Sequence, residues 1–374
     1  MIIERVLKEL EEKKQRRLNG KINSIPFGLS RFSTVLPGIE QGRYYNITAG
    51  SKVGKSQLCD ALFVYNPLDF ILNNPNSGIK LKILYFSLEM SKESKVRQLM
   101  SYYLFKKTGE IISPAKMQSK FADYILEDSK LEFFKTEQQF FDFFEQYVTI
   151  YDNIRNPFGI YKEVRKYAHS HGSYYDKSGN KLDTLKIETG EEKEGLRIEY
   201  YKPDDLEEYV VIITDHASLV GTEKGNTQHQ SMSKFSGYYM HMRDRWNYTP
   251  VLVQQQALEG EKQQFTYKGD SIVSKLKPSP DNLAENKTIG RDCDYMLGLF
   301  APNRFGIKEY DGYDLTKLKD TFRELSIIYS RHSAGSQCIP LLFLGACNYF
   351  EELNRPITQQ DYDRITGLQQ QMKN

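Results

Sequence analysis

The feature that most constrains this chain is the segment AGSKVGKS at 49–56, which joins an apolar run to a helix-compatible stretch. The run Tyr44–Thr48 contains β-branched and aromatic residues, and Gln57–Tyr65 can continue as a helix. A strand, a glycine-containing turn ending in Gly-Lys-Ser and a helix form the P-loop arrangement, whose backbone N–H groups surround an anion. A chance GKS in a loop is the alternative, which the strand-then-helix context disfavours.

The residue types in this segment fit a polyphosphate. Lys55 is expected to reach the β- and γ-phosphates, and the Ser56 hydroxyl to take a Mg²⁺ coordination position. The first glycine of the usual pattern is Ala49 here, a small residue that the position accepts at negative φ. The expected phosphate-binding set is Ala49, Gly50, Ser51, Lys52, Val53, Gly54, Lys55 and Ser56.

Two acids follow other apolar runs. Asp215 comes directly after Tyr209–Thr214, and Glu89 follows Ile83–Phe86 in the tetrapeptide SLEM. Because ligands bind at the carboxyl ends of strands in open α/β sheets, Asp215 is expected to hold the metal's water shell. Glu89 is expected to polarise the water that attacks the γ-phosphate. Taken alone, Asp215 is typical of a turn residue, and Glu89 is equally typical of an acid in the first turn of a helix.

The remaining pattern predicts an α/β fold with a mostly parallel central sheet flanked by helices. Short apolar runs alternate with helix-compatible stretches, which is typical of a sheet covered on both faces. A polar segment with turn signals, 171–202, interrupts the alternation and predicts an inserted β-hairpin. The further runs are Val148–Tyr151, Pro250–Val253, Tyr295–Phe300 and Leu325–Tyr329.

These pieces together resemble the ATPase domain of the DnaB-like replicative helicases, within the RecA-like P-loop proteins. The most specific feature is SLEM at 87–90 with Arg97 downstream. The segment 211–219, VIITDHASL, resembles the family's metal-binding strand, and 250–256, PVLVQQQ, resembles a strand that ends in a γ-phosphate-sensing glutamine. The segment 326–331, SIIYSR, resembles the late strand whose basic residues act on a neighbour's ATP.

The resemblance implies ATP and Mg²⁺ as cofactors, bound between the subunits of a ring that is expected to be a hexamer. It implies that Gln256 senses the γ-phosphate and that Arg331 acts on the ATP of the next subunit. The family has a Lys two residues before that Arg, where this chain has Tyr329. The spacing to Gly335 also allows His332 to take the position of Arg331.

A basic loop is the expected contact with single-stranded DNA. The segment 262–277, KQQFTYKGDSIVSKLK, carries four Lys and one Asp with Phe265 and Tyr267 between them. Lysines on phosphates and aromatic faces for stacking suit DNA binding without sequence preference, although a solvated loop with several lysines is equally ordinary. The expected DNA-binding residues are Lys262, Lys268, Lys275 and Lys277.

The ends of the chain are expected to lie outside the ATPase domain, which spans 21–352. Residues 2–18 place Ile3, Val6, Leu7 and Leu10 on one helical stripe. Such a helix, within 1–20, either packs on its own domain or docks on a neighbouring subunit. Residues 353–374 read as a polar tail, frayed at its end.

Composition excludes several classes of protein. The 374 residues include 51 Lys and Arg against 49 Asp and Glu, a formal net charge of +2. This balance argues against a nucleic-acid coat or a membrane-surface protein, and no apolar stretch approaches the ~18 residues of a membrane span. The charged N-terminus lacks a signal-peptide core. Four cysteines without a CxxC pair indicate reduced thiols and a cytoplasmic protein, in the host cytoplasm if it is viral: Cys59, Cys293, Cys338 and Cys347.

The leading interpretation is an ATP hydrolase and replicative DNA helicase that moves on single-stranded DNA. The alternatives are a RecA-like recombination or repair ATPase and a non-hydrolysing nucleotide-binding module with a regulatory role. SLEM disfavours the former, and the intact Lys55, Ser56, Asp215 and Glu89 disfavour the latter. The family's primase-recruiting N-terminal domain is expected to be absent, which suggests a phage-type enzyme or one that uses a separate primase or loader.

Overall fold

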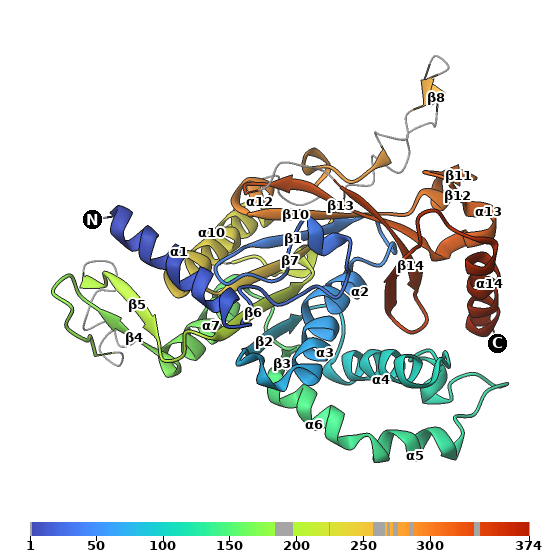
Figure 1. The fold of residues 1–374 in the computed structure, drawn as a ribbon, viewed down its shortest axis with the longest axis horizontal. Helices are drawn as coiled ribbons and strands as arrows, with labels where there is room; N and C mark the ends of the chain where they lie inside the picture. Colours follow the sequence, from blue (N-terminus) through green and yellow to red (C-terminus); the bar gives the residue numbers. More distant parts are fainter. Residues whose placement is uncertain are drawn as a thin grey trace.

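A nine-stranded sheet forms the centre of the computed structural model, in the order β15-β14-β13-β10-β1-β7-β6-β2-β3 (Figure 1). The structure describes residues 2–183, 197–223, 225–256, 266–267, 270–271, 276–283, 288–332 and 337–373. The strands of the sheet are β1 (Tyr45–Ala49), β2 (Lys80–Ser87), β3 (Val148–Tyr151), β6 (Glu208–Asp215), β7 (Thr249–Gln255), β10 (Tyr295–Phe300), β13 (Phe322–Ser330), β14 (Cys338–Leu344) and β15 (Tyr349–Glu352).

The sheet is parallel from β10 to β3 and antiparallel at its other edge, which confirms the expected mostly parallel α/β fold. β13 pairs antiparallel with both β10 and β14, and β14 pairs antiparallel with β15. The short connections 331–337 and 345–348 explain the antiparallel pairing of β13 with β14 and of β14 with β15, because a parallel pair needs a crossover of about a dozen residues or more. Strands β14 and β15 were not expected from the sequence.

Helices cover both faces of the sheet. Alternate residues of β6 point to opposite sides: Val211 and Ile213 pack in one core, and Val210 and Ile212 in the other. Against the first core lie α2 (Lys55–Asp60), α3 (Asn66–Asn73), α4 (Lys92–Thr108) and α6 (Gln138–Tyr147), with α5 (Asp128–Thr136) packed on α4 and α6. Against the second lie α7 (Pro157–Ser170), α10 (Gln228–Trp246) and α12 (Thr288–Asp292).

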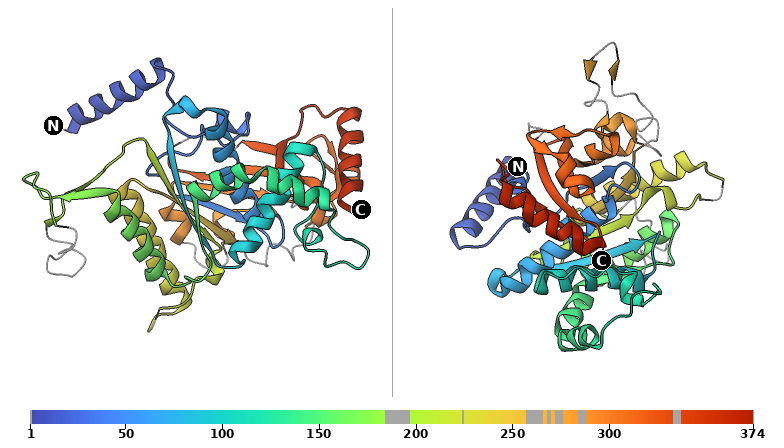
Figure 2. Two further views of the ribbon diagram at one scale, coloured as in Figure 1. Left: turned by 90° about the horizontal axis from the view of Figure 1, so that it is seen from below. Right: turned by 90° about the vertical axis from the view of Figure 1, so that its right-hand side faces the viewer.

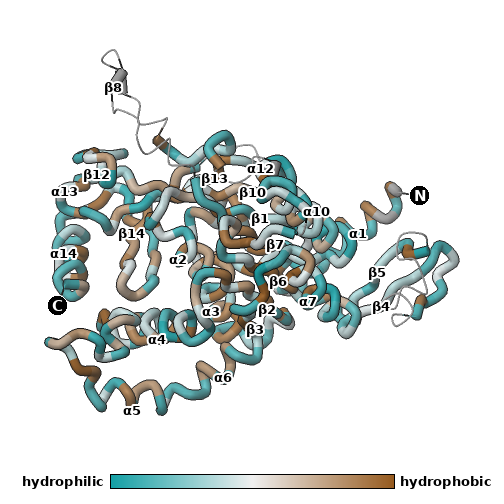
Figure 3. Tube along the Cα trace, turned by 180° about the vertical axis from the view of Figure 1, so that it is seen from behind, coloured by the Kyte–Doolittle hydropathy of each residue, from teal (hydrophilic) through white to brown (hydrophobic). Residues whose placement is uncertain are grey.

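The helix expected at Gln57–Tyr65 begins earlier and changes form. It starts as α2 at Lys55 and continues as a π-helical turn over Ala61–Tyr65, every residue of which is buried. In the view of Figure 3, hydrophobic residues are concentrated along the central strands and these covering helices. Among the described residues, no helix is both long and apolar enough to cross a membrane.

Helix α1 (Ile2–Leu18) projects from the body of the molecule (Figure 2). Its C-terminal end is held by Arg16, which pairs with Glu207 and donates to the Ile22 carbonyl at 2.9 Å. Its apolar stripe remains in solvent, with Leu7 58% and Leu10 57% exposed. The expectation that this stripe packs on its own domain is therefore wrong, whereas docking on a neighbouring subunit stays a prediction.

The inserted segment contains the expected antiparallel pair, β4 (Gly172–Tyr175) with β5 (Tyr200–Pro203). Residues 184–196 of this segment lie outside the described residues. The pair projects at the same end of the molecule as α1 (Figure 1). Two-stranded pairs also form between β8 (Thr266–Tyr267) and β9 (Asp270–Ser271) and between β11 (Glu309–Tyr310) and β12 (Tyr313–Asp314).

The polar tail expected over 353–374 instead contains a packed helix, α14 (Gln359–Lys373). Ile365 is fully buried, and the Gln369 amide donates to the Leu318 carbonyl at 2.8 Å. These contacts join α14 to α13 (Leu315–Leu318) in a third core beside β14. The glutamine-rich composition concealed the helix because most of its residues face solvent.

Candidate nucleotide-binding site

The carboxyl ends of four neighbouring parallel strands bring the expected site residues to one edge of the sheet. β1 runs into the P-loop, β2 into Glu89, β6 ends at Asp215, and β7 is followed by Gln256. The register places Ser87 opposite Asp215 and Ala49 opposite Gln255, so the strands end at the same level. The Leu88 N–H donates to the Asp215 carbonyl at 2.8 Å and ties the SLEM turn to β6.

The P-loop has the backbone that a phosphate cradle requires. Gly54 caps α2 with φ of +111°, a conformation that favours glycine. A Cβ at Gly54 would lie 3.0 Å from the ring of Phe343, so the position also needs a residue without a side chain. Lys55 begins α2 and is buried. The N–H groups at this helix start are available to a phosphate, which the geometry therefore fits.

Ser56 and Asp215 meet as the sequence predicts. The Ser56 hydroxyl donates to Asp215 Oδ1 at 2.8 Å, and Asp215 is 2% exposed. A hydroxyl and a carboxylate are oxygen ligands of the kind that Mg²⁺ prefers, either directly or through its waters. The donor set at this edge therefore fits a hydrated Mg²⁺ bound beside a phosphate chain.

The second oxygen of Asp215 belongs to a buried ionic network that sequence analysis missed. Asp215 Oδ2 lies 3.3 Å from Lys95 Nζ and 3.2 Å from the Tyr85 hydroxyl, whose single proton is shared between Asp215 and Asp60 Oδ1 at 2.8 Å. Lys95 Nζ also contacts both oxygens of Asp60, at 3.0 and 3.2 Å, and donates to Tyr85 at 2.6 Å. Asp60 interrupts the apolar helical stretch LCDALFVY, and a charge in such a stretch signals a buried partner.

The network favours the ionised forms of Lys95 and Asp215. Burial alone would lower the pKa of Lys95, but Asp60 and Asp215 outweigh it and raise that pKa above its usual value. Burial would raise the pKa of Asp215, yet the Lys95 ammonium and the Ser56 hydroxyl hold it below the usual range. For Asp60, burial prevails and raises the carboxyl pKa. Lys95 thus serves as the buried counterion of Asp215.

Glu89 stands at the mouth of the site. Its side chain is 55% exposed, and Oε2 lies 3.5 Å from Nε2 of His216. The Ser87 hydroxyl closes the turn beneath it by donating to the Met90 carbonyl at 2.6 Å. An exposed carboxylate at the carboxyl end of the strands is placed to contact a water beside a bound phosphate chain.

Gln256 lies directly behind the P-loop. Its backbone N–H donates to the Ala49 carbonyl at 3.0 Å, and its side-chain amide donates to the Thr48 hydroxyl at 2.7 Å. These two bonds connect the end of β7 with the end of β1. A change at the phosphates could therefore reach the segment after β7 through Gln256.

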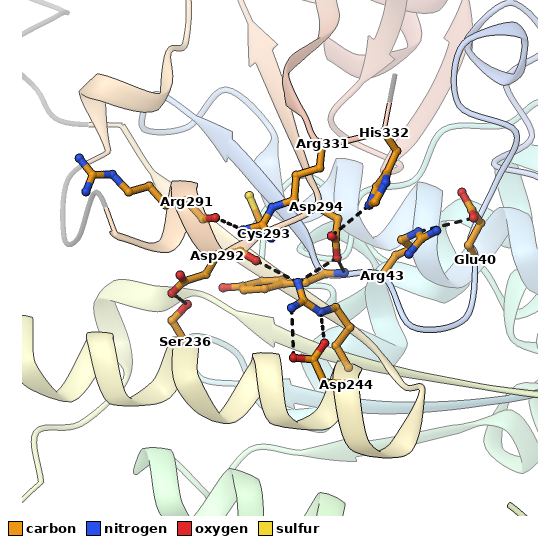
Figure 4. A network of polar contacts seen from close by, with 12 residues as sticks. Glu40, Arg43, Ser236, Asp244, Arg291, Asp292, Cys293, Asp294, Arg331 and His332 are labelled. Carbon is orange, nitrogen blue, oxygen red and sulfur yellow. Dashed lines mark hydrogen bonds and ion pairs between the residues drawn. The ribbon is translucent and has the colours of Figure 1, made fainter. Parts of the chain in front are cut away.

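Arg331 and its own P-loop lie at opposite ends of the strands: the P-loop follows the carboxyl end of β1, whereas Arg331 lies near its amino end. Ser330 pairs with Tyr295, which in turn pairs with Tyr45 at the start of β1. The side chain of Arg331 is directed to the carbonyl of Arg291, and His332 Nε2 lies 3.2 Å from Asp294 Oδ1 (Figure 4). Neither Arg331 nor His332 is brought to the nucleotide-binding edge of the same chain.

The expected DNA-binding lysines are only partly described. Lys277 lies 2.9 Å from Glu324 Oε1 and over the ring of Tyr310 at 5.3 Å, so its ammonium is engaged within the chain. The other three, Lys262, Lys268 and Lys275, lie outside the described residues.

No protein-family model matches this chain, and no curated protein matches it in sequence. Solved structures do match. One of them, an ATPase domain, superposes with a TM-score of 0.64 at 16% identity, over 95% of this chain and 99% of that chain. A DnaB-like replicative helicase, from a structure that describes its interactions with primase, superposes with a TM-score of 0.62 at 16% identity, over 94% of this chain and 66% of that chain.

The fold is that of a DnaB-like helicase ATPase domain. The similarity covers nearly the whole chain and confirms the expected RecA-like architecture. The similarity concerns the fold, and the residues of the candidate site lie at strand ends of this central sheet.

Two arginines support the P-loop and were not expected from the sequence. Arg323 is fully buried, donates through Nε to the Val53 carbonyl at 2.7 Å, and lies over the ring of Phe343 at 4.9 Å. Arg304, which is exposed, bonds to the Ser51 carbonyl. The adjacent charged residues Arg323 and Glu324 at the start of the strand FRELSIIYS were the available signal.

Other titratable groups do not form a second centre in the described part of the chain. His169 packs against the Tyr174 ring, and His171 stacks on Tyr167 with 3.8 Å between the ring centroids. Among the described residues, no group of three or more His, Cys, Asp and Glu side chains is arranged to hold a metal ion. The four cysteines, all described, form no disulfide.

Proposed function

We propose that this chain is the ATP-hydrolysing motor domain of a ring-forming, replicative-type DNA helicase that moves along single-stranded DNA. The observation that carries the proposal is that the proposed site residues lie at opposite ends of the strands. Ser56, Asp215 and Glu89 lie at the carboxyl ends of the parallel strands, and Arg331 lies at their amino ends. Arg331 can therefore reach only the nucleotide of another copy of the chain.

Each side chain has a distinct task in the proposed hydrolysis. Lys55 and the P-loop N–H groups hold the phosphates. Mg²⁺ held by Ser56 and Asp215 would offset the negative charge of the phosphates. Glu89 orients the attacking water and accepts its proton, and the exposed carboxylate has room for both. Gln256 senses the γ-phosphate, and Arg331 of the next subunit stabilises the charge that develops on it.

Contact with DNA is assigned to the segment 262–277. Lys262, Lys268 and Lys275 are the proposed phosphate contacts. Lys277 is a weaker candidate than its sequence position indicates, because its ammonium already pairs with Glu324. Helix α1, whose apolar stripe lies in solvent, is proposed to dock on the adjacent subunit of the ring.

The test is steady-state ATP hydrolysis by the full chain with and without single-stranded DNA. Hydrolysis is expected to rise with DNA and to fall by about a hundredfold or more in Glu89→Gln, which should still bind ATP. Glu93→Gln, at the first turn of α4, is the matched control and should keep its activity. Hydrolysis that ignores DNA would overturn the helicase proposal, and binding without hydrolysis would favour a regulatory module. A forked-duplex assay then separates a helicase from a recombination ATPase.

A further inference from the structure

The buried side of the metal site contains a cation that the proposed reaction does not itself require. Lys95 comes from α4, Asp60 from α2, Tyr85 from β2 and Asp215 from β6, so four elements converge on one ammonium. The side chains of Lys95, Asp60 and Asp215 are 5%, 3% and 2% exposed. Buried charges of this kind are costly unless they are paired, and here every contact is within 3.3 Å.

The network divides the two oxygens of Asp215 between two partners. Oδ1 accepts from Ser56 on the nucleotide side, whereas Oδ2 accepts from Lys95 on the buried side. The Tyr85 hydroxyl lies 3.2 Å from Oδ2 and 2.8 Å from Asp60 Oδ1, so it joins the two carboxylates. A carboxylate bonded at only one oxygen can turn about its Cβ–Cγ bond. The contacts at Oδ2 prevent this rotation and keep Oδ1 directed at Ser56 and the metal's position.

We propose that Lys95, held by Asp60 and Tyr85, is a positioning residue for the Mg²⁺ site. It sets how much Mg²⁺ the chain needs to bind a nucleotide. Lys95 does not touch the nucleotide, and it acts through the orientation of Asp215. Groups that orient metal ligands in this way typically change metal affinity by about 10–100-fold when removed. The inference deepens the proposed function and rests on it.

The test compares variants that keep the local charge and the packing. Lys95→Met/Asp60→Leu removes one positive and one negative charge together, so the formal charge beside Asp215 is unchanged. Asp60 and Lys95 are replaced together because an unpaired buried charge is costly, and because Asp215 loses its ammonium partner the folding of this variant is verified first by circular dichroism. Tyr85→Phe removes the hydroxyl that joins Lys95, Asp60 and Asp215 and leaves the ring in place. Tyr313→Phe, which loses a buried hydroxyl bonded to the Asn354 carbonyl, is the matched control.

Binding of a non-hydrolysable ATP analogue to the full chain is titrated with Mg²⁺ and repeated in EDTA. The half-saturating Mg²⁺ concentration should rise about tenfold in the double variant and less in Tyr85→Phe. Binding in EDTA and the control Tyr313→Phe should not change. A Mg²⁺ requirement equal to that of the unmodified chain in both variants would overturn the inference. If the double variant does not fold, Tyr85→Phe decides alone. If the unmodified chain binds no analogue, the proposed function fails instead.

Discussion

The shape of the P-loop depends on side chains that are remote from it in sequence. The Arg323 guanidinium reaches across from β13 to the Val53 carbonyl and rests on Phe343, the ring that leaves no room for a Cβ at Gly54. Burial lowers the pKa of Arg323 to about 10, so the group remains a cation at neutral pH. A phosphate entering the loop thus finds a backbone already held in place.

Replacement of Arg323 by Met should loosen the loop. The Val53 carbonyl would lose a charged donor, and the expected loss is about 2 kcal/mol of unfolding free energy, with nucleotide affinity reduced about tenfold. Chemical unfolding and binding of a fluorescent ATP analogue measure the two quantities. Arg304→Met, at an exposed arginine on the neighbouring Ser51 carbonyl, should have a much smaller effect on stability. Equal effects of the two substitutions would contradict a special role for Arg323.

At the scale of the element, helix α1 has an apolar stripe that is exposed to solvent in the described part of the chain. A 17-residue helix whose apolar stripe faces water gains little from packing, and polar contacts such as the pair of Arg16 with Glu207 anchor its C-terminal end. The stripe therefore points to an intermolecular contact.

Charge placed on this stripe should prevent assembly without unfolding the domain. Leu7→Asp/Leu10→Asp alters residues that are more than half exposed, so the melting temperature should hardly change. The oligomer, measured by sedimentation velocity, should dissociate at concentrations where the unmodified chain remains assembled. Leu72→Asp, at an exposed leucine of α3, provides the control for a new surface charge. An unchanged oligomer would show that α1 is not part of the interface between subunits.

A second element-scale contact joins the two ends of the domain. The Glu352 carboxylate at the end of β15 accepts from the Arg31 and Phe32 N–H groups, both at 3.0 Å, and from the Ser30 hydroxyl at 3.0 Å. Burial would raise the pKa of Glu352, but these donors outweigh it and hold the pKa below its usual value of 4.5.

This contact should give a defined pH dependence of stability. Because the folded-state pKa is depressed, the contribution of Glu352 is complete above the unfolded pKa and is lost as pH falls through the folded pKa. Glu352→Gln should reduce the unfolding free energy by about 2 kcal/mol at neutral pH, and the difference should shrink only below pH 4.5. Urea unfolding across this range measures it. Glu351→Gln, in a surface pair with Arg364, should cost well under about 1 kcal/mol.

At the scale of the whole molecule, the two ends of the parallel strands carry two halves of one proposed site. The P-loop lies at the carboxyl ends of the parallel strands, and Arg331 lies where β1 and β10 begin. In a ring of identical chains arranged head to tail, one edge can face the other across each interface.

Mixing of variants tests this arrangement. Arg331→Ala should lower hydrolysis by about 10³-fold or more, and Lys55→Ala should abolish nucleotide binding in its own site. A mixture of the two inactive chains should recover activity, because some interfaces then combine an intact P-loop with an intact Arg331. His332→Ala in place of Arg331→Ala distinguishes the two neighbouring candidates. Arginine action within one chain would leave the mixture inactive.

Much of the nucleotide-binding edge followed from the sequence. Local patterns placed Ser56 after the P-loop and Asp215 at the end of a strand, and the structure joins them at 2.8 Å. Strand-then-acid and glycine-turn patterns are local, and parallel strands necessarily end at a common edge, so such residues converge without knowledge of the packing. The mostly parallel fold followed for the same reason.

Tertiary structure decided the features that depend on contacts between distant segments. The Lys95 network and the bond from Arg323 to Val53 join residues far apart in the sequence, and no local pattern specifies which charge a buried charge will meet. The packing of α14 depends on a few buried residues such as Ile365 within a polar helix. The sequence by itself determined which residues follow the strands at the candidate site, because strand patterns and turn chemistry are encoded locally. Only the folded core determined what holds them there, because burial and pairing arise from the three-dimensional arrangement.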